Sequence, residues 1–226
     1  MVRTKLKDRI LPDYTKGEEI FNMVSHIVGG AFAIAALVLC VIMAALRGDG
    51  WGVTSGAIYG GTMILLYTMS SIYHGLTPPT AKKVFQIIDH CSIFLLIAGT
   101  YTPMTLAGIR RVDPLIGWII FGVVWGCAVI GIVFNAIDLS GFKIFSMICY
   151  LAMGWCVVFA FKTTATVLTL PGTVFLITGG VAYTIGAVLY ALGKKHRYIH
   201  SVFHLFVLAG SILHFFCILF YVMPTR

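Results

Sequence analysis

Three histidines have the residue type and the spacing of a metal site. His200 and His204 are four residues apart, and at 3.6 residues per turn such a pair lies on one face of a helix, as two ligands of one ion must. His74 lies far from them in the sequence and must come from another helix. Three neutral imidazoles with an open fourth position are typical of catalytic zinc, which can lower the pKa of a bound water to about 7. These residues therefore predict a Zn²⁺ site.

Two further polar residues, Ser70 and Asp89, are expected at the same depth. Ser70 precedes His74 with the spacing S-x-x-x-H, and Asp89 is the only acidic residue inside a predicted apolar run. An unpaired carboxylate there is costly and is a candidate for function. We predict that Asp89 is a general base for the metal water and that Ser70 hydrogen-bonds this water or an oxyanion. The alternative is a structural ion pair between Asp89 and one of three lysines: Lys82, Lys83 or Lys195.

A third group of polar residues opens the first apolar run. Glu19, Asn22 and His26 follow one another at i, i+3 and i+7, so they share one helix face. They are expected to contact the metal ligands on the side away from the metal, or to close the site on its cytoplasmic side. Helix capping and hydrogen bonds between helices explain them almost as well.

The elements that must position these residues are membrane helices. Of the 226 residues, 59% are hydrophobic and 11% are charged, whereas a soluble domain carries about 25% charged residues. The sequence contains seven apolar runs, each long enough to cross a bilayer at about 20 residues. We therefore predict an all-α, polytopic membrane protein, a seven-transmembrane-helix bundle over residues 20–226 after a cytoplasmic N-terminal segment, residues 1–19. The runs are Ile20–Leu46, Val53–His74, Val84–Ala107, Leu115–Ala136, Phe142–Phe161, Thr173–Leu192 and Ile199–Val222.

Basic residues predict the orientation, because Lys and Arg concentrate in cytoplasmic loops. With the N-terminus inside, eleven of the 16 Lys and Arg fall in inner segments. The arrangement predicts a multi-pass protein of the inner (plasma) membrane with the histidines near the cytoplasmic face. The net charge of +8 is then explained by topology and by attraction to anionic lipids, and no nucleic-acid partner is indicated. The inner residues are Arg3, Lys5, Lys7, Arg9, Lys16, Lys82, Lys83, Lys143, Lys194, Lys195 and Arg197.

Four motifs together resemble a known family. They are Glu19-x-x-Asn22-x-x-Ser25-His26, Ser70-x-x-x-His74, the stretch from Asp89-His90-Cys91-Ser92 to Gly99-Thr100-Tyr101-Thr102-Pro103, and His200-x-x-x-His204. The chain is similar over essentially its full length to the progestin and adipoQ receptor (PAQR) superfamily, specifically its bacterial hemolysin III branch. The resemblance implies seven helices, an inside N-terminus, zinc held by His74, His200 and His204, and an aspartate, Asp89, that binds the metal through water. It also implies membership of a wider group of proposed membrane hydrolases that includes alkaline ceramidases.

Three functions are compatible with these residues. The first is a zinc-dependent hydrolase, an amidase or esterase, whose lipid substrate enters from the inner leaflet. The second is a regulator or sensor of membrane lipid state in which zinc is structural. The third is a pore-forming hemolysin, which the branch name implies, although seven mostly apolar helices offer no continuous polar stripe to line a channel. In all three, membrane lipids are the expected partners.

Overall fold

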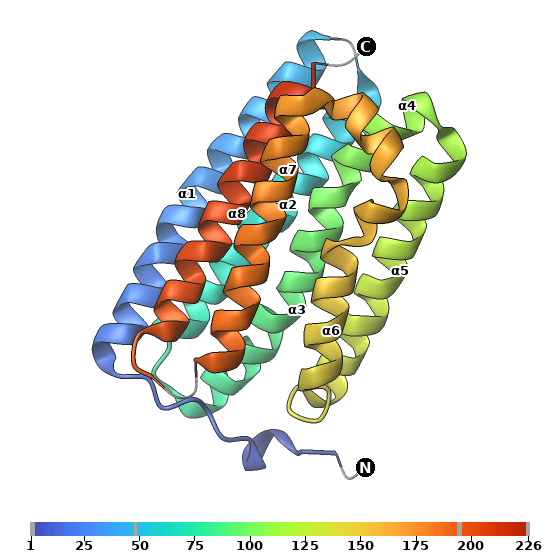
Figure 1. The fold of residues 1–226 in the computed structure, drawn as a ribbon. Helices are drawn as coiled ribbons and strands as arrows, with labels where there is room; N and C mark the ends of the chain where they lie inside the picture. Colours follow the sequence, from blue (N-terminus) through green and yellow to red (C-terminus); the bar gives the residue numbers. More distant parts are fainter. Residues whose placement is uncertain (1–2, 48, 194–195, 225–226) are drawn as a thin grey trace.

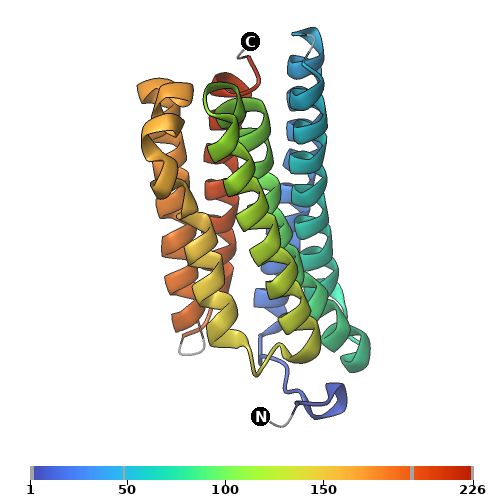
Figure 2. The ribbon, with the colours of Figure 1, turned by 90° about the vertical axis from the view of Figure 1, so that its right-hand side faces the viewer.

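The apolar runs of the sequence form long helices that lie side by side. The computed structural model describes residues 3–47, 49–193 and 196–224, and in this part every regular element is helical. Figures 1 and 2 show a bundle with the N-terminal segment under one end, while α8 finishes at the other end. The elements are η1 (Leu6–Asp8), α1 (Lys16–Leu46), α2 (Gly50–Gly75), α3 (Pro79–Pro103), the π-helix η2 (Met104–Ile109), α4 (Arg110–Val112), α5 (Pro114–Asp138), α6 (Lys143–Gly154), η3 (Cys156–Ala160), α7 (Phe161–Leu192) and α8 (Ile199–Tyr221).

Five helical stretches in the described part are long and apolar enough to cross a membrane. Large apolar side chains such as Ile27, Val28 and Ile34 of α1 point outward, each more than half exposed, and such a surface requires lipid around it. The chain is therefore an all-helical membrane protein, as predicted. The stretches are Lys16–Leu46, Pro79–Val112, Pro114–Asp138, Lys143–Leu192 and Ile199–Tyr221.

Several predicted boundaries differ from the observed ones. The predicted run Phe142–Phe161 is interrupted after Gly154, where the 3₁₀-helix η3 follows α6. The Tyr101 hydroxyl donates to the Gly154 carbonyl and accepts from the Val157 amide, at 2.8 and 3.0 Å. These bonds satisfy backbone groups that the interruption would otherwise leave unpaired. A tyrosine from α3 thus stabilises a break that the apolar pattern does not reveal.

Leu170, Pro171 and Gly172, which fall between the predicted runs Phe142–Phe161 and Thr173–Leu192, lie within α7. Thr169 has a φ of 59° and a ψ of 178°, so α7 consists of two helical pieces joined at a kink. Pro171 favours the break, because its ring cannot donate a hydrogen bond and clashes with the preceding turn. The first piece continues upward from α6 and η3, and the second returns along the bundle (Figure 2). The predicted run Thr173–Leu192 corresponds to the second piece.

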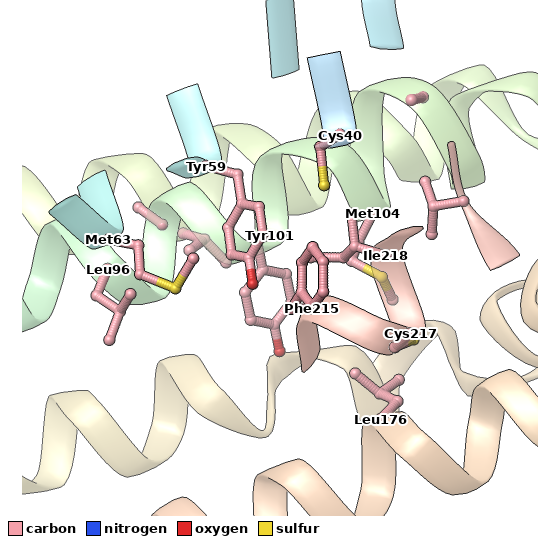
Figure 3. Packing of buried hydrophobic residues seen from close by; sticks show 14 of the residues in the cluster. Cys40, Tyr59, Met63, Leu96, Tyr101, Met104, Leu176, Phe215, Cys217 and Ile218 are labelled. Carbon is pink, nitrogen blue, oxygen red and sulfur yellow. The ribbon is translucent and has the colours of Figure 1, made fainter. Parts of the chain in front are cut away.

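The buried core depends on close contacts between helices. Figure 3 shows Tyr59, Met104 and Phe215 packed together, with side chains from α1, α2, α3, α7 and α8 around them. α1 packs most extensively against α2, and it does so through small residues such as Ala33, Ala36 and Cys40, which are fully buried. Small residues let membrane helices approach closely and gain van der Waals contact.

Gly60→Ala is expected to destabilise the bundle, whereas Gly61→Ala is not. A Cβ at Gly60 would lie 2.6 Å from the Cα of Leu37 on α1, whereas one at Gly61 would have no atom within 4 Å. Overpacking of this kind costs about 1–3 kcal/mol. Thermal unfolding in detergent should therefore show a lower midpoint for Gly60→Ala than for the neighbouring control. Equal midpoints would contradict the close approach of α1 and α2.

Candidate metal centre

Three buried histidines converge at one end of the bundle. His74 lies in the last turn of α2, and His200 and His204 lie in the first turns of α8. Each offers one ring nitrogen, and these atoms all lie within 4.8 Å of one another. The residues are only 3%, 9% and 1% exposed, and the Nε2 atoms of His200 and His204 are 3.0 Å apart. The three histidines singled out in the sequence could thus hold a metal ion.

The surroundings of His74 fit a metal ligand. Its Nδ1 lies 2.6 Å from Oε2 of Glu19, while its Nε2 is buried without a hydrogen-bond partner in the described structure. A buried ring nitrogen without a partner costs free energy. Histidines that bind metals usually donate their other ring N–H to a carboxylate, which fixes the orientation of the ring. Glu19 therefore holds His74 with Nε2 free to bind a cation, and the donor set of three imidazoles fits a divalent ion such as Zn²⁺.

Lys82 connects Glu19 to the end of α2. Its Nζ lies 2.9 Å from Oε1 of Glu19 and donates to the carbonyls of Tyr73 and Leu76 at 3.1 and 3.0 Å. A lysine at this position satisfies carbonyl groups that the last turn of a helix leaves free. The end of α2, which carries His74, is thereby held against α1 and α3.

Asp89 and Ser70 border the same space from α3 and α2. Ser70 is buried one turn before His74, and its side chain interacts with the Asp89 carboxylate. The Asp89 side chain is 14% exposed and lines an internal cavity, although its oxygens do not belong to the mutually close set of histidine nitrogens. An approach of Asp89 to the metal through water agrees with this placement. The roles of both residues stay predictions.

The alternative ion pair of Asp89 is not formed with either described lysine. Lys82 pairs with Glu19, and the Lys83 Nζ donates to the carbonyl of Lys7 at 2.8 Å. Lys195, the third predicted partner, lies outside the described residues. The acidic group of α3 therefore faces the cavity rather than Lys82 or Lys83.

The polar face at the start of α1 lies against the histidines. The His26 ring packs on His204 with a centroid distance of 3.9 Å and meets the Tyr67 ring edge-on. Asn22 is fully buried, and neither its amide nor the His26 ring nitrogens have a hydrogen-bond partner in the described structure. Capping does not explain these residues, because Thr15 and Glu18 form the capping box of α1. Glu19 and His26 instead contact two of the candidate ligands.

The site opens into a large internal cavity. Its volume is about 950 Å³, within the usual range of small-molecule sites of about 300–1,000 Å³. Ser70, Asp89, His200 and His204 line it near one end, and it continues between the helices as far as Trp155 and His214. We call the opposite limit, where residues 9–15 cross the end of the bundle, the mouth.

Comparisons with known proteins show the family of this chain. The sequence profile described as "Haemolysin-III related" matches residues 14–215. The chain belongs to the haemolysin-III family. It is 41% identical to Hemolysin-3 of Bacillus cereus over 208 residues, which are 92% of this chain and 93% of that protein. It is 39% identical to the Hemolysin-3 homolog of Bacillus subtilis (strain 168), over 92% of this chain and 96% of that protein.

A more distant relative extends the comparison to the wider superfamily. The human monocyte to macrophage differentiation factor is 26% identical over 213 residues, which are 89% of this chain and 83% of the human protein. The predicted resemblance to the PAQR superfamily and its hemolysin III branch is thus confirmed. In this haemolysin-III chain, the matched residues include all three histidines of the candidate centre.

Sequence reasoning missed Tyr14, which covers the centre of this haemolysin-III protein. Its ring stacks on His200 with a centroid distance of 4.9 Å and an interplanar angle of 20°, and lies 5.9 Å from the ring of His74. Tyr14 precedes α1 and belongs to no apolar run, so no periodicity could have pointed to it. Burial raises the pKa of its phenol well above the ordinary range, and Tyr14 therefore remains neutral at physiological pH.

Proposed function

We propose that this haemolysin-III protein is a zinc-dependent hydrolase, an amidase or esterase, that acts on lipids of the inner leaflet. One observation carries the proposal: the convergence of His74, His200 and His204 beside a cavity that His200, His204, Asp89 and Ser70 line. Catalytic zinc sites combine three protein ligands with an open position, and perturbed polar groups beside a largely apolar cavity are typical of active sites.

Each residue has a defined task in the proposed reaction. When bound, Zn²⁺ supplies Lewis-acid polarisation of a carbonyl and activation of water. Asp89 takes the proton of the attacking water as general base, and Ser70 donates a hydrogen bond to the oxygen on which charge develops. Glu19 keeps the His74 ring in one orientation through the 2.6 Å contact with Nδ1. Burial of the three histidines keeps bulk water away from these groups.

The cavity supports a lipid as the substrate. Beyond Asp89 it is bordered by apolar side chains of α2, α3 and α8, including Leu66, Leu96 and Val207. An acyl chain would lie among these residues, since apolar surface gains about 25 cal/mol per Å² when it leaves water. The carbonyl of an amide or ester at the base of such a chain would lie beside Asp89.

We also propose that seven segments cross the inner membrane, with the N-terminus inside. The kink at Thr169 divides the 50-residue stretch Lys143–Leu192 into two crossings, and α2 adds another between α1 and α3. The N-terminal segment and the end of α8 lie at opposite ends of the bundle (Figure 1), as an odd number of crossings requires. The basic residues favour a cytoplasmic N-terminal segment, although Lys194, Lys195 and Arg226 lie outside the described residues.

Cysteine labelling tests this topology. A cysteine at Gly50, before the main turns of α2, should react with an impermeant thiol reagent added to intact cells, whereas one at Thr80 should react only after the cells are opened. The native cysteines are buried or half-buried, so a protein without the added cysteine serves as the background. The reverse pattern would place the histidines at the outer face and contradict the inner-leaflet proposal.

A sensor with structural zinc is the second candidate, and Tyr14 favours it. The stacking of Tyr14 on His200 covers the centre from the mouth, and a covered metal is typical of structural sites. In this case the metal would hold α2 and α8 together, and lipids would bind without reaction. Lysis of membranes, which the names of the bacterial relatives describe, is the third candidate.

One assay distinguishes the three candidates. Purified protein is loaded with zinc and incubated with vesicles that contain lipid amides, lipid esters and an entrapped dye. New fatty acid, detected by mass spectrometry and absent after chelation, would support the hydrolase. Dye release without cleavage would indicate pore formation. Lipid binding with neither cleavage nor leakage, across a broad lipid panel, would leave the sensor.

A further inference from the structure

A second polar site lies at the mouth of the cavity and is built around Arg9. Arg9 belongs to the segment before α1, yet it is only 6% exposed and lines the cavity. Its Nη2 donates to Oε1 of Gln86 on α3 at 3.1 Å, while its Nε is buried without a hydrogen-bond partner in the described structure. This guanidinium is therefore held in position but is only partly satisfied.

The charge of Arg9 is not neutralised by an ion pair within the described part of the chain. The carboxylate that acts on it electrostatically is Asp138, but this group accepts hydrogen bonds from the amides of Thr4, Ser140 and Gly141 at 2.9, 3.1 and 3.0 Å. Burial lowers the pKa of Arg9, although a guanidinium stays protonated in proteins. A buried cation without a counter-ion is costly, and such groups are usually paired.

A second cation borders the mouth from α6. Lys143 is the first residue of this helix, and its Nζ lies 5.2 Å from the centroid of the Tyr190 ring. It lines the same cavity as Arg9, and both cations act electrostatically on His90 of α3. The His90 ring is itself held by the Gln86 carbonyl and the Tyr190 hydroxyl, at 2.8 and 3.1 Å. Two positive charges from separate elements thus face one opening.

We propose that Arg9, together with Lys143, binds the anionic head group of a membrane lipid whose tail occupies the cavity. A guanidinium matches phosphate and carboxylate oxygens through directed, charge-assisted hydrogen bonds. The substrate class of the proposed hydrolase would then be an anionic lipid rather than a neutral one, and this part of the inference rests on the proposed function. The binding itself does not depend on any reaction.

The distance along α3 supports this assignment. Gln86, which holds Arg9, precedes Asp89 by three residues, a rise of about 4.5 Å along a helix. A head group at Arg9 would therefore place the first bonds of the lipid one turn deeper, beside Asp89 and the histidines. A free phosphate could satisfy Arg9 in the same way, but it would leave the apolar length of the cavity unused.

Lipid binding by the metal-loaded protein tests the inference without requiring turnover. Native mass spectrometry from detergent would compare phosphatidylglycerol, which is anionic, with phosphatidylcholine, which has no net charge. The variants are Arg9→Gln, Arg9→Lys and Lys143→Gln, and the matched control is Arg3→Gln, an exposed arginine of the same segment that donates to the Ile137 carbonyl. Inorganic phosphate is added as a competitor in a separate series.

We expect the wild-type protein to prefer phosphatidylglycerol and Arg9→Gln to bind it at least about tenfold more weakly, since a charge-assisted hydrogen bond contributes roughly 1.4 kcal/mol or more. Arg9→Lys and Lys143→Gln should have intermediate affinity, and Arg3→Gln should resemble the wild type. Zinc content should not change in any variant. If Arg9→Gln fails to fold, the weaker binding of phosphatidylglycerol by Lys143→Gln provides the same test.

Three results would overturn the inference. Equal binding of the two lipids by the wild type would exclude an anionic site, and unchanged binding by folded Arg9→Gln and Lys143→Gln would exclude these residues. Displacement of the lipid by inorganic phosphate at a matched concentration would assign the site to a free anion. If the protein binds anionic lipid through Arg9 but hydrolyses no lipid at all, the proposed hydrolase is refuted, whereas the binding site is confirmed.

Discussion

Asp89→Asn is expected to lower lipid hydrolysis by about 10²- to 10⁴-fold, which is typical of the loss of a general base, and to leave the metal in place. Asparagine keeps the size of the side chain and can still interact with Ser70, but it cannot accept the proton of the attacking water. Metal should stay bound because Asp89 lies outside the mutually close set of histidine nitrogens. Zinc content, thermal stability and turnover would be measured on the same preparations.

Asp113→Asn is the matched control for this change. Asp113 caps α5 through the amide of Ile116 at 3.0 Å, and asparagine caps helices about as well as aspartate does. The control should therefore keep full turnover. An Asp89→Asn protein with wild-type turnover would exclude the general-base role. If the wild-type protein hydrolyses none of the lipids tested and the variant is unimpaired in cells, the hydrolase is excluded and the sensor remains.

The convergence of the histidines could be predicted because it depends on local periodicity and topology. The spacing of His200 and His204 places both on one helix face whatever the neighbours are. His74 ends one apolar run and His200 begins another, and the four runs predicted between them, an even number of crossings, bring both to the same end of the bundle. The same reasoning brought Asp89 to this end, and the all-helical membrane fold followed from hydropathy.

The features that the sequence did not reveal depend on contacts between distant segments. Tyr14 and Arg9 lie in a polar segment without helical periodicity, and only tertiary packing places them over His200 and beside Gln86. The interruption after Gly154 likewise depends on the hydroxyl of Tyr101. Helix ends also shifted, because hydropathy marks the lipid-facing part of a helix rather than its last hydrogen bond.

The same limit applies to the polar face of α1. Spacing placed Glu19, Asn22 and His26 on one side of the helix but could not decide between capping, hydrogen bonds between helices and support of the metal ligands. The structure assigns the capping box to Thr15 and Glu18, and Glu19 lies 2.6 Å from the His74 ring, a contact between helices that would also support a metal ligand. The rotation of α1 about its own axis, which packing against α2 and α8 determines, is the information that was missing.

Removal of two of the three candidate ligands is expected to abolish zinc binding almost completely. The wild-type protein should contain about one zinc ion per chain, as structural and catalytic sites of this donor set do, and a protein with both His74→Ala and His200→Ala should contain almost none. One remaining imidazole, His204, cannot complete a site. His196→Ala, which changes an exposed histidine near the start of α8, is the matched control and should keep its zinc. Elemental analysis of protein purified without added metal gives the ratio directly.

Glu19→Gln provides a graded version of the same experiment. The glutamine cannot hold the His74 ring through a charged hydrogen bond, and loss of such a partner typically weakens metal binding about 10- to 100-fold. Competition with a chelator should therefore remove zinc from Glu19→Gln before the wild type, although both are loaded at saturating zinc. The thermal midpoint should fall in the same order, because a ligand that binds only the folded state stabilises it by mass action. Wild-type zinc content in the double variant would exclude these histidines as the metal site.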